Sequence, residues 1–360
     1  MSEPSGLERD DPSRGSVAVT SERIGIGVLG AAAIAPRAIL YPAREGDGVE
    51  VVAIASRSRD RAEALASKFK IPHVWSSYEE VIADDDVDAV YIALPASLHH
   101  QWSARALQAG KHVLCEKPIT TNLADARDLV QMAAGRSLVL AEAFHYRYHP
   151  YLGRIADLVR ERVGEIIAVE VVFSNDIETT EPIYWDSTLG GGALFHVGCY
   201  AVHCIRSVTG EELEVDGAAA IWINGVDVTL SAELRLPNGA PVRLRTSMTS
   251  PLGFENWLWI RGEEGELSAS NFVIPQLSAK VAEYASAVRV RRVGEPTYVE
   301  VADPVYSYTC QLRAFAEAIR TGTTMLTSGT DIVNNMSTIE DILRAARLSV
   351  WTRAQAVERR

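Results

Sequence analysis

The first part of the chain alternates short apolar runs with longer segments in which apolar residues recur at helical spacing. Runs that are apolar almost throughout predict strands buried on both faces, as in a parallel sheet. Such strands are predicted at residues 24–29, 49–55, 73–75, 88–93, 113–115 and 138–141. Helices are predicted at 60–70 and 123–134. Another helix is predicted to begin at residue 77, and a further one to end at residue 109. Strands separated by helix-length segments indicate an α/β fold with a doubly wound parallel sheet.

The pattern changes beyond residue 165, where apolar and polar residues often alternate and few helices intervene. Alternation with period two predicts strands that have one buried face. These strands are predicted at 166–173, 217–223, 228–236, 242–249 and 257–261. One helix is predicted to end at residue 162, and others to cover 193–208, 309–320 and 331–347. The Pro-Asn-Gly sequence at 237–239 predicts a hairpin turn. We expect an α+β unit with a large, open, mostly antiparallel sheet, one face of it covered.

These patterns divide the chain into four parts. Residues 1–22 have few large apolar groups and no apolar segment typical of a secretory signal, so we predict a disordered tail. Residues 23–143 are predicted to form the parallel-sheet domain, and 144–347 a substrate-binding α+β domain, to which the family resemblance described below also assigns dimerisation. Residues 348–360 are a predicted C-terminal extension.

Composition and charge exclude several classes of protein. The 360 residues, 47% of them hydrophobic, are enough for two domains with a large core. A net charge of −12 argues against binding nucleic acid or anionic membranes by bulk attraction. No apolar run approaches the length of a membrane span. The four cysteines form no CxxC pair or disulfide-like framework, which predicts a reduced cytoplasmic protein.

A turn of small residues follows the first predicted strand, as in Rossmann dinucleotide-binding domains. Gly25, Gly27 and Gly30 match the glycine fingerprint formally, but the fingerprint must come after a strand, and no strand precedes Gly25. The pattern in register is Gly30-x-Ala32-x-x-Ala35. Gly30 permits the tight turn, and Ala32 lets a pyrophosphate approach the start of a helix.

The second predicted strand ends in Ser56 and Arg57, where an NAD-binding domain usually has an acid for the ribose 2′-hydroxyl. A hydroxyl and a guanidinium suit a 2′-phosphate instead. The alternative is a solvated basic loop, because Asp60 and Glu63 follow. We predict that NADP(H) is preferred, with NAD(H) as the second choice.

Two further turns are predicted at the same sheet edge. Leu94 and Pro95 follow the fourth strand, and Glu116, Lys117 and Pro118 follow the fifth. Chemistry in open α/β sheets sits beyond the carboxyl ends of the strands, so Lys117 is well placed to hold a substrate oxygen. A surface Glu-Lys pair is the alternative. The predicted cofactor-binding residues are Gly30, Ala32, Ala33, Ile34, Ser56, Arg57, Leu94, Pro95, His99, Glu116, Lys117 and Pro118.

Three glycines at 190–192 precede the predicted helix 193–208, whose spacing places His196, Tyr200 and His203 on one face, next to Cys199. Zinc sites usually draw ligands from separate elements, so we predict no metal. Tyr200 could instead exchange a proton with a substrate, its pKa lowered by a cation such as Lys117. The alternative is a core tyrosine with a satisfied hydroxyl.

Taken together, these motifs resemble the family of glucose–fructose oxidoreductase, inositol dehydrogenase and MocA proteins, over nearly the whole chain. The resemblance rests on residues 30–35 (GAAAIA), 94–99 (LPASLH), 115–118 (CEKP), 142–150 (EAFHYRYHP) and 190–200 (GGGALFHVGCY). Within the family, the chain is most similar to the branch with dimeric dihydrodiol dehydrogenases, NADP-dependent D-xylose dehydrogenases and nucleotide-sugar 3-ketoreductases.

The resemblance implies that Lys117 binds the reacting oxygen, that Pro118 helps to seat the nicotinamide and that Tyr200 transfers a proton. The implied reaction moves a hydride between nicotinamide C4 and a secondary alcohol or ketone of a sugar, sugar derivative or cyclic polyol. It also implies a homodimer or homotetramer formed through the C-terminal sheet. The predicted substrate-binding residues are Lys117, Arg147, Trp185, His196 and Tyr200.

One position departs from the family pattern: His196 stands where many members have Asp. An imidazole does not replace a carboxylate as an acceptor of substrate hydroxyls on equal terms. Two other functions stay open: a low-turnover sensor or accessory protein that binds NADP(H), and a structural dimer in which the sheet face matters more than the cleft.

Overall fold

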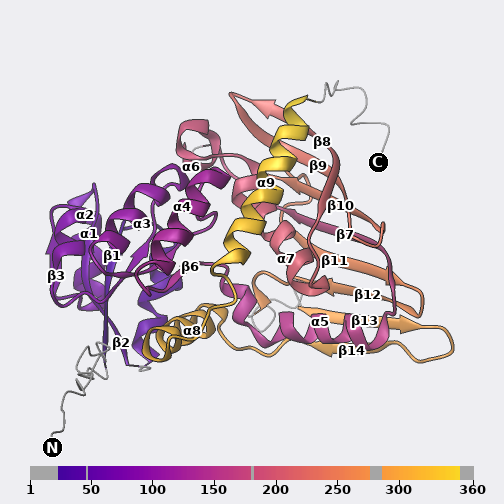
Figure 1. Ribbon diagram of the computed structural model, residues 1–360, viewed down its shortest axis with the longest axis horizontal. Helices are drawn as coiled ribbons and strands as arrows, with labels where there is room; N and C mark the ends of the chain where they lie inside the picture. The colour runs from indigo at the N-terminus through magenta and orange to yellow at the C-terminus, as the bar shows by residue number, and fades with distance from the viewer. Residues whose placement is uncertain (1–22, 46–47, 180–181, 276–285, 349–360) are drawn as a thin grey trace, which may run out of the picture.

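The computed structural model describes residues 23–45, 48–179, 182–275 and 286–348, which form two β-sheets with helices packed around them (Figure 1). The predicted tail at 1–22 lies outside the described residues, as does the predicted C-terminal extension apart from residue 348. The division between 143 and 144 stays a prediction.

The first sheet is parallel throughout and has the strand order β3-β2-β1-β4-β5-β6. Consecutive strands run outward from β1 in one direction and then from β4 in the other, so a crevice opens where the order reverses. Its strands are β1 (Ile24–Leu29), β2 (Val49–Ala55), β3 (His73–Trp75), β4 (Ala89–Ile92), β5 (His112–Cys115) and β6 (Leu140–Glu142). The predicted doubly wound sheet is therefore confirmed.

Helices cover both faces of this sheet, because its strands are apolar on both sides. Residues of α2 (Tyr78–Ala83), α3 (His99–Gln108) and α4 (Leu123–Ala134) belong to one hydrophobic cluster. On the other face, α1 (Arg59–Phe69) is joined by α8 (Ser307–Thr321), which comes from late in the chain. Through α8, a late segment completes the hydrophobic core of the first sheet.

The second sheet has the order β14-β13-β12-β11-β7-β10-β9-β8, and β7 and β10 are its one parallel pair among the described strands. Mostly antiparallel pairing agrees with the sequence prediction. The strands are β7 (Ile166–Ser174), β8 (Glu214–Ile223), β9 (Val226–Arg235), β10 (Pro241–Ser247), β11 (Glu255–Gly262), β12 (Gly265–Ser270), β13 (Ala287–Arg292) and β14 (Tyr298–Val301). The sequence analysis missed the last three strands, whose polar residues weaken the apolar signal.

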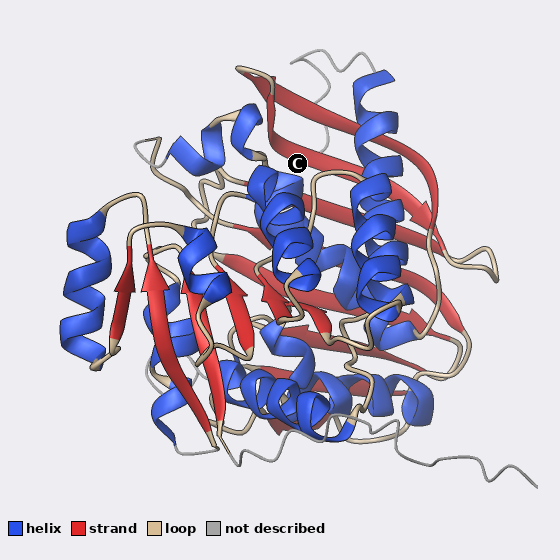
Figure 2. Ribbon diagram, turned by 60° about the vertical axis from the view of Figure 1, so that its left-hand side comes forward, coloured by secondary structure: helices blue, strands red, loops and turns tan. Residues whose placement is uncertain are grey.

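Three long helices lie together on one face of this sheet (Figure 2). They are α5 (Pro150–Arg162), α7 (Cys199–Thr209) and α9 (Thr330–Leu348), and their apolar residues share one cluster with those of the sheet. The same cluster includes residues of β1, β4 and β5, so the two sheets share a continuous core. The opposite face of the second sheet carries the polar half of each alternating strand, as in β10.

The helix predicted at 193–208 is two segments: a π-helical turn at Leu194–Gly198 and then α7. The buried carboxylate of Asp227 on β9 accepts the backbone N–H of Leu194 at 2.8 Å and so satisfies one of the free donors at the helix start. Gly192 has φ 126°, and a Cβ atom there would lie 2.2 Å from Asp227 Oδ1. Glycine is thus required for this carboxylate to approach the chain.

Among the described residues, the segment Ser187–Thr209 has the length and the mean hydropathy, 1.2, of a membrane-spanning helix. Because 72% of it is buried within the protein, it is a helix of the core.

Candidate active site

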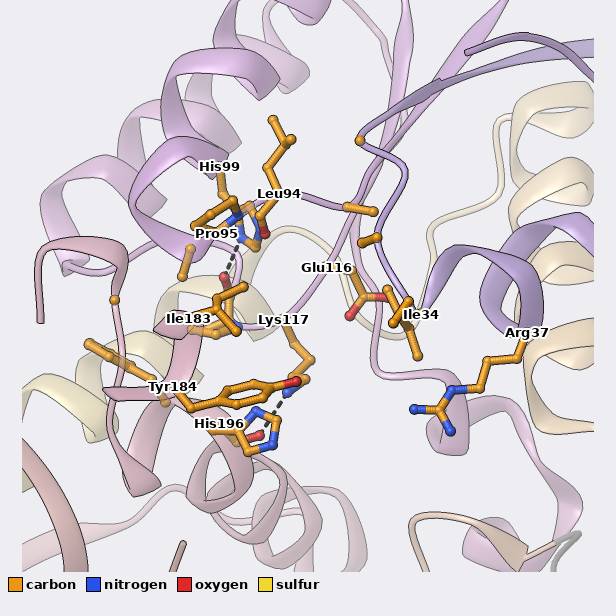
Figure 3. A pocket seen from close by; sticks show the side chains of 18 of the residues that line it. Ile34, Arg37, Leu94, Pro95, His99, Glu116, Lys117, Ile183, Tyr184 and His196 are labelled. Carbon is orange, nitrogen blue, oxygen red and sulfur yellow. Dashed lines mark hydrogen bonds between the residues drawn. The ribbon is translucent and has the colours of Figure 1, made fainter. Parts of the chain in front are cut away.

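A cavity of about 1050 Å³ opens at the reversal point of the first sheet, between that sheet and the segment 182–200. Its walls include the turns that follow β1, β2, β4 and β5 (Figure 3). All twelve predicted cofactor-binding residues line it, although their chemical roles stay predictions. Of the predicted substrate-binding residues, Lys117, His196 and Tyr200 line it as well.

The turn after β1 has the tight geometry that the glycine pattern predicts. Gly30 has φ 104°, and a Cβ atom there would lie 2.5 Å from the carbonyl oxygen of Ala93. The Gly30 N–H donates to Ala55 O at 2.9 Å, which ties the turn to the end of β2. Because of this close approach, backbone atoms and small side chains face the cavity. Such a surface fits a dinucleotide.

Arg37, in the π-helical turn Pro36–Leu40 that follows, points toward the cavity (Figure 3). The sequence analysis missed it, although a cation just beyond a small-residue turn is a signal for an anion. Figure 3 shows it on the opposite side of Glu116 from Lys117. Arg37 therefore adds positive charge to the part of the cavity next to the glycine turn.

The loop after β2 forms a polar end of the cavity. Ser56 and Arg57 line it together with Arg61 and Tyr78, which the sequence analysis did not select. Arg59, by contrast, is exposed and bonds to Glu63 at 2.7 Å. The alternative of a basic loop whose charges are paired locally thus applies to Arg59, while Arg57 faces the cavity.

The turn that carries Lys117 is held by hydrogen bonds from three sides. Tyr91 donates its hydroxyl hydrogen to Glu116 Oε1 at 2.6 Å, and the His99 ring lies 2.7 Å from Pro118 O. Glu142 Oε1 accepts the backbone N–H of Ile119 at 2.9 Å. These contacts fix the backbone on both sides of Lys117.

Lys117 links the two parts of the cavity wall. Its ammonium donates to the backbone oxygen of His196 at 2.7 Å (Figure 3). The ammonium also lies 5.0 Å from the centre of the Tyr200 ring. The Tyr184 ring packs on the imidazole of His196, with centroids 4.0 Å apart, and its hydroxyl points toward Lys117. The two predicted catalytic side chains are therefore neighbours.

Burial controls the protonation of this site. It raises the pKa of Tyr200 well above the usual value, so the expectation that Lys117 lowers this pKa is wrong. Burial, and then the charge of Lys117, holds the pKa of His196 well below its usual value. Near neutral pH the site therefore presents a protonated phenol and a neutral imidazole.

Two predicted substrate-binding residues do not reach the cavity. Trp185 donates its indole N–H to Glu178 O at 3.1 Å and packs near Ile177 on a separate cluster. Arg147 is not among the lining residues, and its charge acts on Cys204 instead.

The ligand atoms of His196, Cys199 and His203 do not gather at one point within the described part of the chain. Cys199 donates its thiol hydrogen to Phe195 O at 3.1 Å, and the His203 ring bonds to protein side chains. These residues were predicted to share one helix face, but each of them makes its own separate contacts.

The fold and the cavity define a dinucleotide-binding enzyme with a second, substrate-side sheet. Residues 24–144 match the model of the oxidoreductase family with an NAD-binding Rossmann fold, and residues 154–268 match the GFO/IDH/MocA C-terminal domain. The chain belongs to this GFO/IDH/MocA family of oxidoreductases.

Several relatives match almost the whole chain. D-xylose 1-dehydrogenase (NADP(+)) 2 of Haloferax volcanii is 35% identical over 323 residues, 89% of this chain and 96% of the relative. A dTDP-3,4-didehydro-2,6-dideoxy-alpha-D-glucose 3-reductase of Actinomadura kijaniata is 33% identical over 90% of this chain and 96% of its own length. The crystal structure of a 3-ketoreductase from Actinomadura kijaniata, in complex with NADP and TDP-benzene, matches with a TM-score of 0.82 and 32% identity, covering 90% of this chain and 98% of that one.

The buried carboxyl of Glu142 generates a prediction about pH. Burial raises its pKa to about 8, against a usual value near 4.5. The folded state therefore keeps this proton while the unfolded chain loses it, and stability falls as the pH rises from about 4.5 to 8. Glu142→Gln keeps an oxygen that can accept the Ile119 N–H but does not ionise.

We expect the stability of Glu142→Gln, relative to the unchanged protein, to rise with pH by up to about 1.4 kcal/mol per pH unit in this window. Urea unfolding at pH 5 and pH 7.5 measures this difference, with exposed Glu211→Gln as the matched control. A stability difference that is the same at both pH values would show that Glu142 is ionised in the folded protein.

Proposed function

We propose that this protein is an NADP(H)-dependent oxidoreductase that acts on a secondary alcohol or ketone of a sugar, sugar derivative or cyclic polyol. The observation that carries the proposal is the convergence of Lys117 and Tyr200 beside a small-residue turn that fits a dinucleotide. When bound, the nicotinamide ring supplies or accepts the hydride. The relatives named above act on xylose or on a dTDP-linked sugar, which supports the substrate class.

The roles of the two side chains follow from their charges. In the reducing direction, negative charge develops on the substrate oxygen as its carbon gains a hydride, and the Lys117 ammonium stabilises that charge. Tyr200 then gives its phenolic proton to the oxygen, for which a hydroxyl that stays protonated near neutral pH is suited. The Lys117 ammonium has three N–H donors and uses one of them for His196 O, so it can also donate to the substrate oxygen.

The preference for NADP(H) over NAD(H) rests on Ser56, Arg57 and Arg61. A guanidinium can bind a 2′-phosphate through two parallel, charge-assisted hydrogen bonds, whereas it gains little from a ribose hydroxyl. Solved relatives contain NADP, in agreement with this assignment.

The alternative of a low-turnover NADP(H) sensor is not favoured, since both Lys117 and Tyr200 face the cavity. We further propose that the protein is cytoplasmic. All four cysteines are free thiols, and three of them are buried, which suits a reducing compartment.

Self-association through the second sheet is also proposed. The half-buried Trp257 and Trp259 lie in a shallow groove on the sheet, with Glu170 and Arg289 at its borders. Large aromatic side chains on a sheet face are typical of an interface between subunits. The groove supports the predicted dimer or tetramer, while the cavity lined by Lys117 and Tyr200 speaks against the alternative of a purely structural dimer.

The first test concerns cofactor choice. Arg57→Ala should weaken NADP binding by about 1.5–3 kcal/mol, the range for a charge-assisted hydrogen bond, and leave NAD binding nearly unchanged. Titration of both cofactors by calorimetry measures the two affinities, and Arg59→Ala, whose guanidinium is paired with Glu63, is the control. Equal losses for NADP and NAD in Arg57→Ala would contradict the assignment.

The second test addresses the chemistry. Lys117→Met removes the cation and Tyr200→Phe removes the hydroxyl, and each should lower kcat by about 10²–10⁴ while NADP still binds. Steady-state turnover is followed by the absorbance of the reduced nicotinamide, with a panel of sugars and cyclic polyols as substrates. Normal turnover of Lys117→Met would overturn the mechanism.

The third test concerns assembly. Light scattering should give a mass of two or four chains of 39.2 kDa. Trp259→Lys, opposite Glu170 on β7, should shift the protein toward the monomer, because the added charge would be desolvated in the interface. Val293→Lys, at a fully exposed position outside the groove, should leave the mass unchanged. A monomeric unchanged protein would contradict the proposal.

A further inference from the structure

A chain of buried polar side chains lies behind the proposed catalytic tyrosine. Tyr146 donates its hydroxyl hydrogen to His203 Nδ1 at 2.7 Å, and His203 donates from Nε2 to Asp331 Oδ2 at 3.2 Å. Tyr146 and His203 are fully buried. Burial lowers the pKa of His203, and the neutral ring satisfies both bonds by accepting at one nitrogen and donating at the other.

The chain continues to the protein surface through α7. The second oxygen of Asp331 accepts a hydrogen bond from Arg206 at 2.9 Å. Arg206 in turn forms two bonds to Glu212, at 2.8 and 2.9 Å. Burial raises the pKa of Asp331, but the bonds from His203 and the charge of Arg206 outweigh it and hold the carboxyl ionised. One carboxylate on α9 therefore binds two side chains of α7, three residues apart.

This arrangement acts on the helix that carries Tyr200. His203 is one helical turn after Tyr200, and the Tyr146 hydroxyl lies 3.4 Å from the Tyr200 backbone oxygen. The Tyr200 ring is also enclosed by other rings whose centres lie 5.2 to 6.2 Å away, those of Phe144, His145, Tyr146 and Phe173. The rings of Phe144 and His203 stack with their centres 4.2 Å apart. The aromatic rings around Tyr200 are therefore in direct contact with the row of hydrogen-bonded polar side chains.

We propose that Tyr146, His203 and Asp331 are positioning residues, which hold α7 in the rotation that directs Tyr200 to the substrate oxygen. Unlike apolar contacts, which permit sliding, hydrogen bonds from two turns of α7 to one carboxylate specify both the rotation and the height of the helix. A displacement of about 1 Å at a reacting group can lower the rate by about 10²-fold. Loss of these hydrogen bonds should therefore lower kcat. The catalytic consequence rests on the proposed role of Tyr200.

The first measurement needs no substrate. In protein with ¹³C-labelled tyrosine rings, the Tyr200 signal is identified by its loss in Tyr200→Phe. We expect this signal to shift in Tyr146→Phe and in Asp331→Asn. Tyr148→Phe, which removes a hydroxyl bonded to Thr327 at 2.8 Å in the same segment, should leave it in place. A Tyr200 signal that stays unchanged in both Tyr146→Phe and Asp331→Asn would overturn the proposal.

The second measurement is a double-mutant cycle on turnover, with the best substrate of the sugar and polyol panel. Tyr146→Phe and Asp331→Asn should each lower kcat by about 10-fold, with KM and the Kd of NADP within about twofold. In a Tyr200→Phe background, Tyr146→Phe should cause no further loss, because it acts through Tyr200.

The outcomes separate the two proposals. A full additional 10-fold loss in the Tyr200→Phe background would contradict the positioning role. Normal turnover of Tyr200→Phe itself would instead remove the proposed catalytic role, while the ¹³C signals would still decide whether the buried chain positions this ring.

Discussion

The structure depends on one ammonium group held at the end of a buried strand. Lys117 follows β5, where the backbone leaves the core, and its charge must be stabilised at the edge of an apolar interior. Hydrogen bonds with Tyr91, His99 and Glu142 fix the adjoining turn, because they satisfy buried polar groups on both sides of the lysine. The ammonium itself bonds to His196 O, so the cation also joins the first sheet to the substrate-side wall.

Burial then determines what each neighbouring group can do. Removing an ionisable side chain from water favours its neutral form, and this raises the pKa values of Tyr200 and Glu142 and lowers that of His196. A neutral imidazole at 196 offers the cavity one hydrogen-bond donor and one acceptor without a charge.

Support for the side chains proposed to be catalytic comes from distant parts of the chain. Asp331 on α9 holds α7, Asp227 on β9 caps the start of the segment that leads into it, and α8 returns to cover the first sheet. Each uses a late segment to hold an earlier one. A charged group buried in this way requires a partner, and the partner fixes the geometry.

The amino-acid sequence by itself determined the first sheet and the list of turns at its edge, because fully buried parallel strands are apolar throughout and a tight turn demands Gly30. It did not reveal β12, β13 and β14, short strands whose polar and charged residues interrupt the apolar pattern. Arg37, Arg61 and Tyr78 were missed at the cavity, and Arg147 and Trp185, which were predicted to bind substrate, are not among its lining residues, because the direction of a side chain depends on packing between segments. Only the tertiary structure decided that the Tyr200 pKa is raised, since desolvation arises from residues far apart in sequence that enclose the ring.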